Sequence, residues 1–124
     1  MDFMPFFFDL KNRTCLFVGG GGIATRKARL IASSGACRVV VAPYITDEMR
    51  ALVASTNGEC HCREFEKKDL DVAMLVICAT DNKHVNRQVS EWAQAQRLPV
   101  NVVDSPSLCS IITPAIVDRS PLII

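Results

Sequence analysis

The chain alternates short apolar segments with segments in which apolar residues recur at helical spacing. Five apolar segments have the length and composition of β-strands, and glycine, proline or polar residues bound them. These expected strands cover residues 14–18, 37–42, 59–65, 73–79 and 99–103. The fourth, AMLVICA, is apolar almost throughout, which is typical of a parallel strand buried on both faces.

Three helical segments lie between these strands. They cover residues 23–34, a stretch that begins after Thr46, and residues 81–96. Strands that alternate with helices indicate βαβ units, so we expect the α/β class with a parallel sheet. Right-handed crossovers then place Gly19, Thr80 and Asp104, which follow three of the strands, at one edge of the sheet. Open α/β sheets bind their ligands at this edge.

A glycine-rich turn joins the first expected strand to the first expected helix. Residues 19–24, GGGGIA, match the pattern G-x-G-x-x-[G/A]. The first glycine permits a tight turn, the third lets the backbone approach a pyrophosphate, and the alanine allows close helix–strand packing. The turn predicts a cofactor site; the alternative is a tight turn without a ligand. The predicted site residues are Gly19, Gly20, Gly21, Gly22, Ile23 and Ala24.

The end of the second strand lacks the acidic residue that usually holds the ribose of a bound dinucleotide. Ala42, Pro43 and Tyr44 occupy that place. Backbone groups of Pro43 and Tyr44 can hold the ribose hydroxyls instead, with the Tyr44 ring near the adenine. No arginine directly follows this strand to bind a 2′-phosphate. The sequence therefore favours NAD over NADP.

The ends of the fourth and fifth strands carry the remaining candidate residues. Thr80 can contact the inner ribose of the cofactor. Asp81 either adds to this site or caps the following helix. Asp104 presents a carboxylate at the end of the fifth strand, and it is either a catalytic group or part of a turn before Ser-Pro.

Composition limits the classes of protein that fit. The chain has 124 residues, of which 49% are hydrophobic and 22% charged, and this indicates one globular domain. A net charge of +1 gives no support for a nucleic-acid or membrane partner. Arg26, Lys27 and Arg29 form a basic group on the first helix. This group is either a solvated face or a feature that attracts an acidic substrate.

Six cysteines are present, and three of them lie in or beside apolar strand-like segments. Free cysteine in such a place behaves as a small hydrophobic residue. No signal peptide is expected, so we place the chain in a reducing cytoplasm. Cys60 and Cys62 alternate on one expected strand and can converge, but two further ligands at suitable spacing are missing. We therefore expect no metal site.

Four stretches together resemble a known family. VGGGGIATRKARL, VICATDNKHVNRQV, NVVDSPSLCS and PAIVDRSPL are similar, in order and spacing, to the precorrin-2 dehydrogenase/sirohydrochlorin ferrochelatase module of siroheme synthases. The resemblance covers nearly the whole chain. It implies a Rossmann-like domain with flanking helices, which we assign to residues 1–106, and it implies that this domain binds NAD and a tetrapyrrole.

The resemblance also implies an activity. The family oxidises precorrin-2 to sirohydrochlorin with NAD⁺, and many members then insert ferrous iron. On this sequence the resemblance assigns the family's catalytic carboxylate to Asp104. It places the cofactor at residues 19–23, Pro43, Tyr44, Thr80 and Asp81. The alternative to an enzyme is a non-catalytic NAD-binding module.

The C-terminal stretch departs from the strand–helix alternation and from the family. Members usually have a Phe and a Met within residues 110–114, where this chain has SIITP. Members also continue past RSPL into a region that dimerises and covers the tetrapyrrole. We therefore expect residues 107–124 to be the start of such a segment, truncated here, with a short β tail that contributes to a two-fold homodimer.

Overall fold

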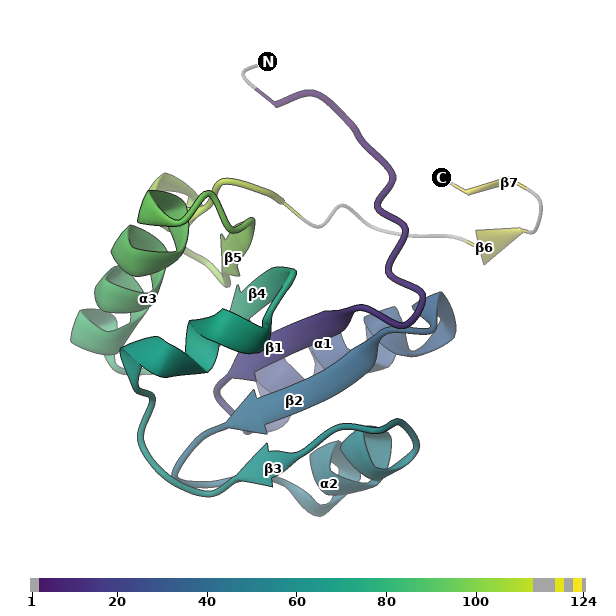
Figure 1. Ribbon diagram of the computed structural model, residues 1–124, viewed down its shortest axis with the longest axis horizontal. Coiled ribbons are helices and arrows are strands. Elements are labelled where there is room, and N and C mark those ends of the chain that lie inside the picture. The colour runs from purple at the N-terminus through teal and green to yellow at the C-terminus, as the bar shows by residue number, and fades with distance from the viewer. Residues whose placement is uncertain (1–2, 113–117, 120–121, 124) are drawn as a thin grey trace.

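Five parallel strands form the central sheet of the protein. The computed structural model describes residues 3–112, 118–119 and 122–123. The strands are β1 (Thr14–Val18), β2 (Cys37–Val41), β3 (Cys60–His61), β4 (Leu75–Cys78) and β5 (Val100–Val102). Their order in the sheet is β3-β2-β1-β4-β5, and every neighbouring pair is parallel (Figure 1). The expected α/β fold is confirmed.

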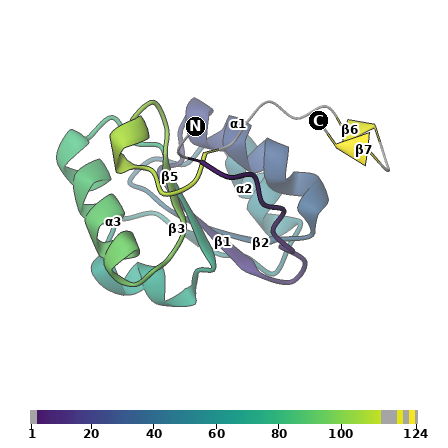
Figure 2. The same cartoon turned by 90° about the horizontal axis from the view of Figure 1, so that it is seen from above.

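Helices cover both faces of this sheet. α1 (Gly22–Ile31) and α2 (Asp47–Ala54) pack on one face (Figure 2). α3 (Lys83–Ala95) and the 3₁₀ helix η2 (Lys67–Val72) pack on the other. Two shorter 3₁₀ helices, η1 (Ala32–Ser34) and η3 (Pro106–Leu108), follow α1 and β5. Among the described residues, each helix is too short or too polar to cross a bilayer.

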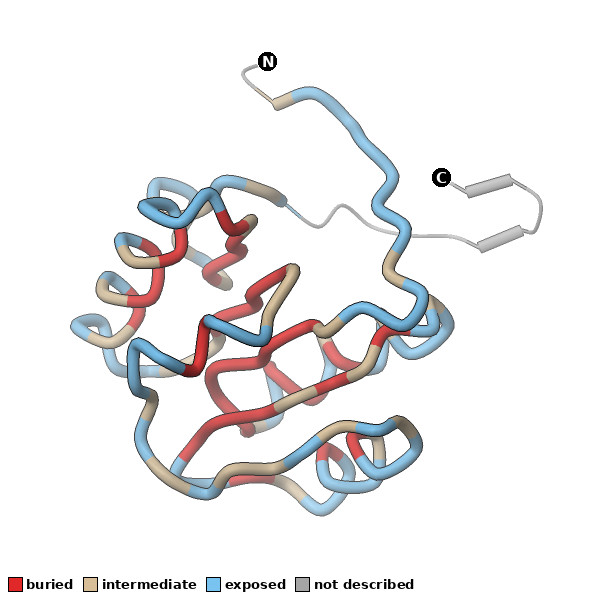
Figure 3. Tube along the Cα trace, viewed as in Figure 1, coloured by how far each residue is buried: buried red, intermediate tan, exposed pale blue. Residues whose placement is uncertain are grey.

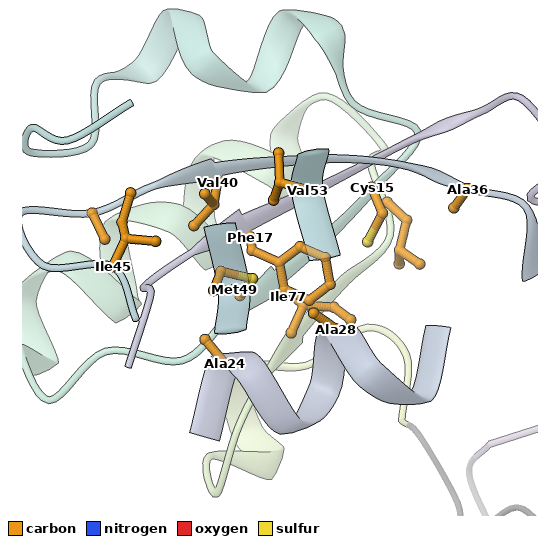
Figure 4. Close-up of a cluster of buried hydrophobic side chains, with 12 residues drawn as sticks. Cys15, Phe17, Ala24, Ala28, Ala36, Val40, Ile45, Met49, Val53 and Ile77 are labelled. Carbon is orange, nitrogen blue, oxygen red and sulfur yellow. The ribbon is translucent and has the colours of Figure 1, made fainter. Parts of the chain in front are cut away.

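The two faces of β1 contribute to two separate core clusters. Cys15 and Phe17 pack with α1 and α2, whereas Leu16 and Val18 pack with α3 and η2. All four side chains are at most 2% exposed. Figure 4 shows the first cluster, where Phe17 lies beside Met49 of α2. Buried residues follow the strands through the middle of the molecule (Figure 3). Burial on both faces explains why this strand is almost continuously apolar.

Two expected elements are shorter in the structure. The third strand, expected over residues 59–65, contains only Cys60–His61, because the Arg63 amide donates to the His61 carbonyl at 3.0 Å and turns the chain out of the sheet. The first helix ends at Ile31 and continues as η1. Gly35, with a φ of 78°, then ends the helical stretch in the left-handed conformation that glycine adopts readily.

The stretch after η3 covers the free edge of β5. The Ser110 amide donates to the Val100 carbonyl at 2.9 Å, and the Ser110 hydroxyl accepts from the Val100 amide at 3.0 Å. Further along, Cys109 Sγ accepts from the Val102 amide at 3.1 Å and lies 3.2 Å from the Val102 carbonyl oxygen. Two side chains thus bond the main-chain groups that a sixth strand would otherwise bond.

A small antiparallel sheet lies in the C-terminal stretch. It pairs β6 (Asp118–Arg119) with β7 (Leu122–Ile123) and is separate from the five-stranded sheet (Figure 1). Residues 113–117 lie outside the described residues. They include the end of SIITP, the stretch that differs from the family, and most of the expected apolar segment AIVD.

Candidate functional site

Three strand ends lie level with one another at the carboxyl edge of the sheet. Val18 of β1 pairs with Cys78 of β4, which in turn pairs with Val102 of β5. The chain segments that leave these strands therefore begin side by side. They carry the glycine turn, Thr80 and Asp104, so the structure brings these predicted site residues to one edge.

Steric contacts demand glycine at the first two positions of the turn. Gly19 has a φ of 115°, and a Cβ there would collide with the Ala79 carbonyl at the end of β4. A Cβ on Gly20 would lie 2.6 Å from the carbonyl oxygen of Tyr44. The turn is therefore pressed against the ends of two other segments. The sequence pattern requires glycine at Gly19 but allows any residue at position 20. Only the unbroken run of four glycines indicates that glycine is needed at Gly20 as well.

Gly21 and Gly22 face open space instead. A Cβ on either glycine would have no described atom within 4 Å. Gly21 is the N-cap of α1, and the first helical hydrogen bond runs from the Thr25 amide to the Gly21 carbonyl at 2.9 Å. The amides of Gly22, Ile23 and Ala24 precede this bond and have no acceptor within the helix.

The start of α1 is also suited to an anion electrostatically. The first turn of α1 contains no acidic residue. The helix dipole leaves a partial positive charge at this end. Unpaired amides, an open approach and a positive helix end together form a site that fits a pyrophosphate.

The loop after β2 lies directly beside the glycine turn. The Thr46 amide donates to the Gly20 carbonyl at 2.9 Å, and the Gly19 amide donates to the Val41 carbonyl at 3.0 Å. Pro43 and Tyr44 are exposed in this loop, and 69% of Tyr44 is accessible. An exposed aromatic ring next to an anion-binding turn is suited to packing on an adenine.

The segment after β3 contacts this loop, and its arginine is held in an ion pair. Cys62, whose thiol donates to the Pro43 carbonyl at 3.1 Å, brings the neighbouring Arg63 close to the loop. Arg63 makes two hydrogen bonds to Asp69, at 2.9 and 2.7 Å. Burial opposes ionisation of Asp69, but the hydrogen bonds from Arg63 and from the Glu66 amide outweigh it and lower the pKa of Asp69.

The basic group on α1 is partly engaged with α2. Arg29 Nε and a terminal nitrogen of its guanidinium donate to the Glu48 carboxylate at 2.7 and 2.9 Å. Hydrogen bonding to Arg29 lowers the pKa of the exposed Glu48 carboxyl. Arg29 therefore links the two helices. Arg26 is exposed and Lys27 is half-buried on the same helix.

Thr80 is fixed at the end of β4 by a residue that the sequence analysis did not identify. Its hydroxyl donates to Asn86 Oδ1 at 2.5 Å, and its carbonyl accepts from Asn86 Nδ2 at 3.1 Å. The same Oδ1 accepts from the Cys78 thiol at 3.1 Å. Asn86 is 8% exposed on α3. A buried asparagine three residues into an amphipathic helix is a weak signal in sequence, because polar residues there usually face water.

The alternative role of Asp81 as a helix cap is wrong. The cap of α3 is Asn82, whose Oδ1 accepts from the amides of His84 and Val85 at 3.0 and 3.1 Å. Either residue type can cap a helix, and the position is decided by the backbone, which is extended at Asn82. Asp81 is left exposed beside Thr80 at the carboxyl edge of the sheet.

Asp104 lies in a tight turn directly after β5. The Ser105 amide donates to the Val102 carbonyl at 3.1 Å and closes the turn. Asp104 has a φ of 61°, a left-handed conformation that costs a residue with a side chain about 1–2 kcal/mol. Its side chain is exposed at the carboxyl edge. The turn and the catalytic interpretation of Asp104 are therefore compatible.

The six cysteines are all free thiols. Burial raises the pKa of Cys15 and of Cys78 to about 12, so both remain protonated and unreactive. Among the described residues, no three His, Cys, Asp or Glu side chains gather in a way that could hold a metal ion.

The fold and the turn geometry define a Rossmann-like dinucleotide-binding domain. A family model described as "Putative NAD(P)-binding" matches residues 6–115. The chain belongs to this NAD(P)-binding family.

Curated relatives and a solved structure cover the same region. The chain is 56% identical over its full length to a siroheme synthase of Saccharophagus degradans and 52% identical to one of Pseudomonas fluorescens. It spans 27% of the length of each relative. The solved structure of "SirC, precorrin-2 dehydrogenase" matches 98% of this chain with a TM-score of 0.82 and 29% identity, and 60% of that chain is covered.

Proposed function

We propose that the chain is the dinucleotide-binding part of an enzyme that oxidises precorrin-2 to sirohydrochlorin in siroheme biosynthesis. The observation that carries the proposal is the level arrangement of the glycine turn, Thr80 and Asp104 at the carboxyl edge of the sheet. Similarity along this whole chain to part of siroheme synthases, and along nearly all of it to part of a precorrin-2 dehydrogenase, supports the proposed reaction.

The proposed cofactor site is centred on the open half of the glycine turn. The amides of Gly21 and of the first turn of α1 donate to the pyrophosphate, and Gly19 and Gly20 keep the turn close to the sheet. Pro43 and Tyr44 hold the adenosine end, while Thr80 and Asp81 lie towards the nicotinamide end. When bound, NAD⁺ supplies the acceptor for a hydride.

We propose NAD rather than NADP as the cofactor. A 2′-phosphate needs a cation at the end of β2. Arg63, which follows the residue bonded to the Pro43 carbonyl, already makes two hydrogen bonds to Asp69. Moving Arg63 to a phosphate would leave the Asp69 carboxylate, whose side chain is 7% exposed, without its charged partner.

Asp104 is the proposed general base. Oxidation of precorrin-2 removes a hydride, which carries both electrons to the nicotinamide, and a proton, which leaves the macrocycle. The Asp104 carboxylate takes this proton and passes it to solvent, to which the side chain is exposed. The left-handed backbone at Asp104 is energetically costly, and it keeps the side chain at the carboxyl edge. Such costly conformations are common at functional sites.

Three further parts of the proposal concern partners and location. Ferrous iron is a second substrate if the enzyme also metalates sirohydrochlorin, in which case Asp104 also accepts pyrrole protons. Residues 107–124 begin a segment that dimerises and covers the tetrapyrrole. The cytoplasm is the proposed location, because six free cysteines suit a reducing compartment.

The Asp104→Asn variant tests the proposed reaction. It keeps the side-chain shape and the left-handed tendency of the position, and it removes the base. Because the chain spans 27% of its relatives, the assay uses it both alone and joined to the remaining part of the Saccharophagus degradans relative. Sirohydrochlorin formation should fall about 10²- to 10⁴-fold, with NAD⁺ affinity unchanged.

Asp81→Asn tests the alternative base in the same experiment. Wild-type turnover in Asp104→Asn together with lost turnover in Asp81→Asn would transfer the role of base to Asp81. NAD⁺ binding without any sirohydrochlorin formation by the wild-type joined protein would favour a non-catalytic NAD-binding module instead.

A further inference from the structure

Two threonine hydroxyls form a hydrogen-bonded chain from α2 to the glycine turn. Thr46 Oγ1 accepts from the Met49 amide at 3.0 Å and caps α2. It lies 2.7 Å from Thr25 Oγ1, which in turn lies 2.7 Å from the Gly21 carbonyl oxygen. The carbonyl can only accept, so Thr25 donates to it. Each hydroxyl has one hydrogen, and Thr46 must therefore donate to Thr25.

The middle of this chain lies where water has little access. Thr25 is 3% exposed, on the inner side of α1, and Thr46 is half-buried in the loop after β2. A buried hydroxyl that loses its partner is costly, because no water replaces the bond. The arrangement of the two threonines is therefore well defined.

The loop after β2 holds two successive carbonyls of the turn. The Thr46 amide binds the Gly20 carbonyl at 2.9 Å, and the Thr46 hydroxyl acts on the Gly21 carbonyl through Thr25. A trans peptide unit is planar, and its N–H points opposite to its C=O. Fixing these two carbonyls therefore fixes the amides of Gly21 and Gly22 in the opposite direction.

Gly21 and Gly22 lie in open space, so the fixed direction of their amides matters for binding. Apart from the adjacent residues and the backbone of α1, a Cβ on either residue would have no described atom within 4 Å, so side chains from other segments do not restrain these two peptides. Glycine also has the largest backbone freedom of any residue. Without the hydroxyl chain, the Gly21 carbonyl would keep one hydrogen bond, from the Thr25 amide at 2.9 Å, so more of its motion would have to be lost when an anion binds at the Gly22 amide.

We propose that Thr25 and Thr46 are positioning residues for the dinucleotide, because they preset the Gly21 and Gly22 amides that bind its pyrophosphate. This inference rests on the proposed cofactor site. Neither threonine touches the cofactor in this role. Their effect is confined to the pyrophosphate and leaves the adenosine contacts at Pro43 and Tyr44 unchanged.

The Thr25→Val variant tests the inference in the full chain. Valine keeps the shape of threonine and removes the hydroxyl, and Thr25→Ser restores it. ADP and adenosine are titrated separately, with binding followed by calorimetry or by NMR shifts, and NAD⁺ is titrated beside them. The affinity of Thr25→Val for ADP and NAD⁺ should fall about 3- to 10-fold, the worth of one net hydrogen bond, with adenosine affinity unchanged. Thr25→Ser should bind all three ligands as the wild type does.

Thr56→Val is the matched control. Thr56 makes a similar local bond, from its hydroxyl to the Val53 carbonyl at 2.9 Å, but at the opposite end of α2. Thr56→Val should lose stability without losing ADP affinity. If Thr25→Val does not fold, Thr25→Ala, with a better helix former, takes its place.

Two results with the Thr25 variant would overturn the inference alone. One is wild-type ADP affinity in the folded Thr25 variant, and the other is an equal loss of adenosine affinity, which indicates a general structural effect. Failure of the wild-type chain to bind NAD⁺ or ADP would reject the proposed cofactor site itself, and the inference with it. Binding by the wild type that is insensitive to the Thr25 substitution rejects the inference alone.

Discussion

Gly20 and Tyr44 approach each other through their main chains, with no room for a side chain on the glycine. Gly21, the next residue, has open space around it. The two neighbouring glycines therefore have different roles. Gly20 packs against the protein, and Gly21 leaves access for a ligand. Substitution should separate these two roles.

Gly20→Ala should destabilise the fold. The added methyl group would lie 2.6 Å from the Tyr44 carbonyl oxygen and 2.9 Å from Ile45 Cα, so the loop after β2 must move. Forcing extra volume into a packed site costs about 1–3 kcal/mol, which urea denaturation would measure. Gly22→Ala is the control, since it meets open space. Equal stability of the two variants would contradict the close approach.

Gly21→Glu should abolish NAD⁺ binding and keep the fold. The side chain enters open space, so packing is not disturbed, but its carboxylate lies where the pyrophosphate is proposed to bind. Calorimetric titration should show no binding, while the circular dichroism spectrum stays that of the wild type. Gly21→Gln separates charge from size and should retain more affinity. Unchanged affinity in Gly21→Glu would exclude the turn as the cofactor site.

Asn86→Ala should lower the free energy of unfolding by about 1–3 kcal/mol, because it leaves the Thr80 and Cys78 groups without their partner. Chemical denaturation would measure this loss. Glu91→Ala, an exposed position on the same helix, should change stability little. Asn86→Asp should also be destabilised, because it puts an acceptor oxygen where Asn86 Nδ2 donates to the Thr80 carbonyl. A loss no larger than that of Glu91→Ala would show that the contact contributes nothing.

Asp69→Asn should flatten the dependence of stability on pH in the acid range. The pKa of Asp69 is lowered in the folded state, so its stabilising contribution is present above the unfolded-state pKa, about 3.9. The contribution is lost as the pH falls through the lower folded-state pKa. Denaturation curves should show the variant less stable than the wild type at pH 7, with the difference shrinking below about pH 4. A difference that stays constant with pH would refute this assignment. Asp71→Asn, exposed on the same 3₁₀ helix, is the control.

Sedimentation should find a dimer at roughly tens of micromolar, a concentration set by ordinary dimer affinities. We expect a dimer because the isolated two-stranded β6–β7 hairpin is marginally stable in water, and contact with a partner would stabilise it. Removing residues 118–124 should shift the protein towards monomer. A monomer before the removal would contradict the proposed association.

The pattern of residues along each segment predicted the sheet well, because each strand carries its own sequence signal. Burial of β1 and β4 on both faces produces continuous apolar segments, and the four glycines mark the turn that leaves β1. The shortness of β3 was not predictable in the same way. Its residues have strand character, but an edge strand ends where the chain turns away, here through a bond between Arg63 and His61.

Contacts between distant parts of the sequence account for most of what was missed. Thr25 and Thr46 are 21 residues apart, and nothing in either segment alone indicates that their hydroxyls meet. Asn86 similarly acquires its role only when α3 packs on β4. By contrast, η2 carries a local interaction: the Asp69 carboxylate, three residues after Glu66, accepts from the Glu66 amide at 2.7 Å, as the acidic residue of a capping box does.

The covered edge of β5 has a consequence for how copies of the protein can meet. A sheet grows into a filament by adding strands at its open edges, and Cys109 and Ser110 already occupy the hydrogen-bonding groups on this side. The opposite edge, β3, offers two residues for pairing. The sheet is therefore a poor template for open-ended polymerisation. Chains can associate elsewhere on the surface. Such association can leave the carboxyl edge of the sheet, with the glycine turn, accessible to small molecules.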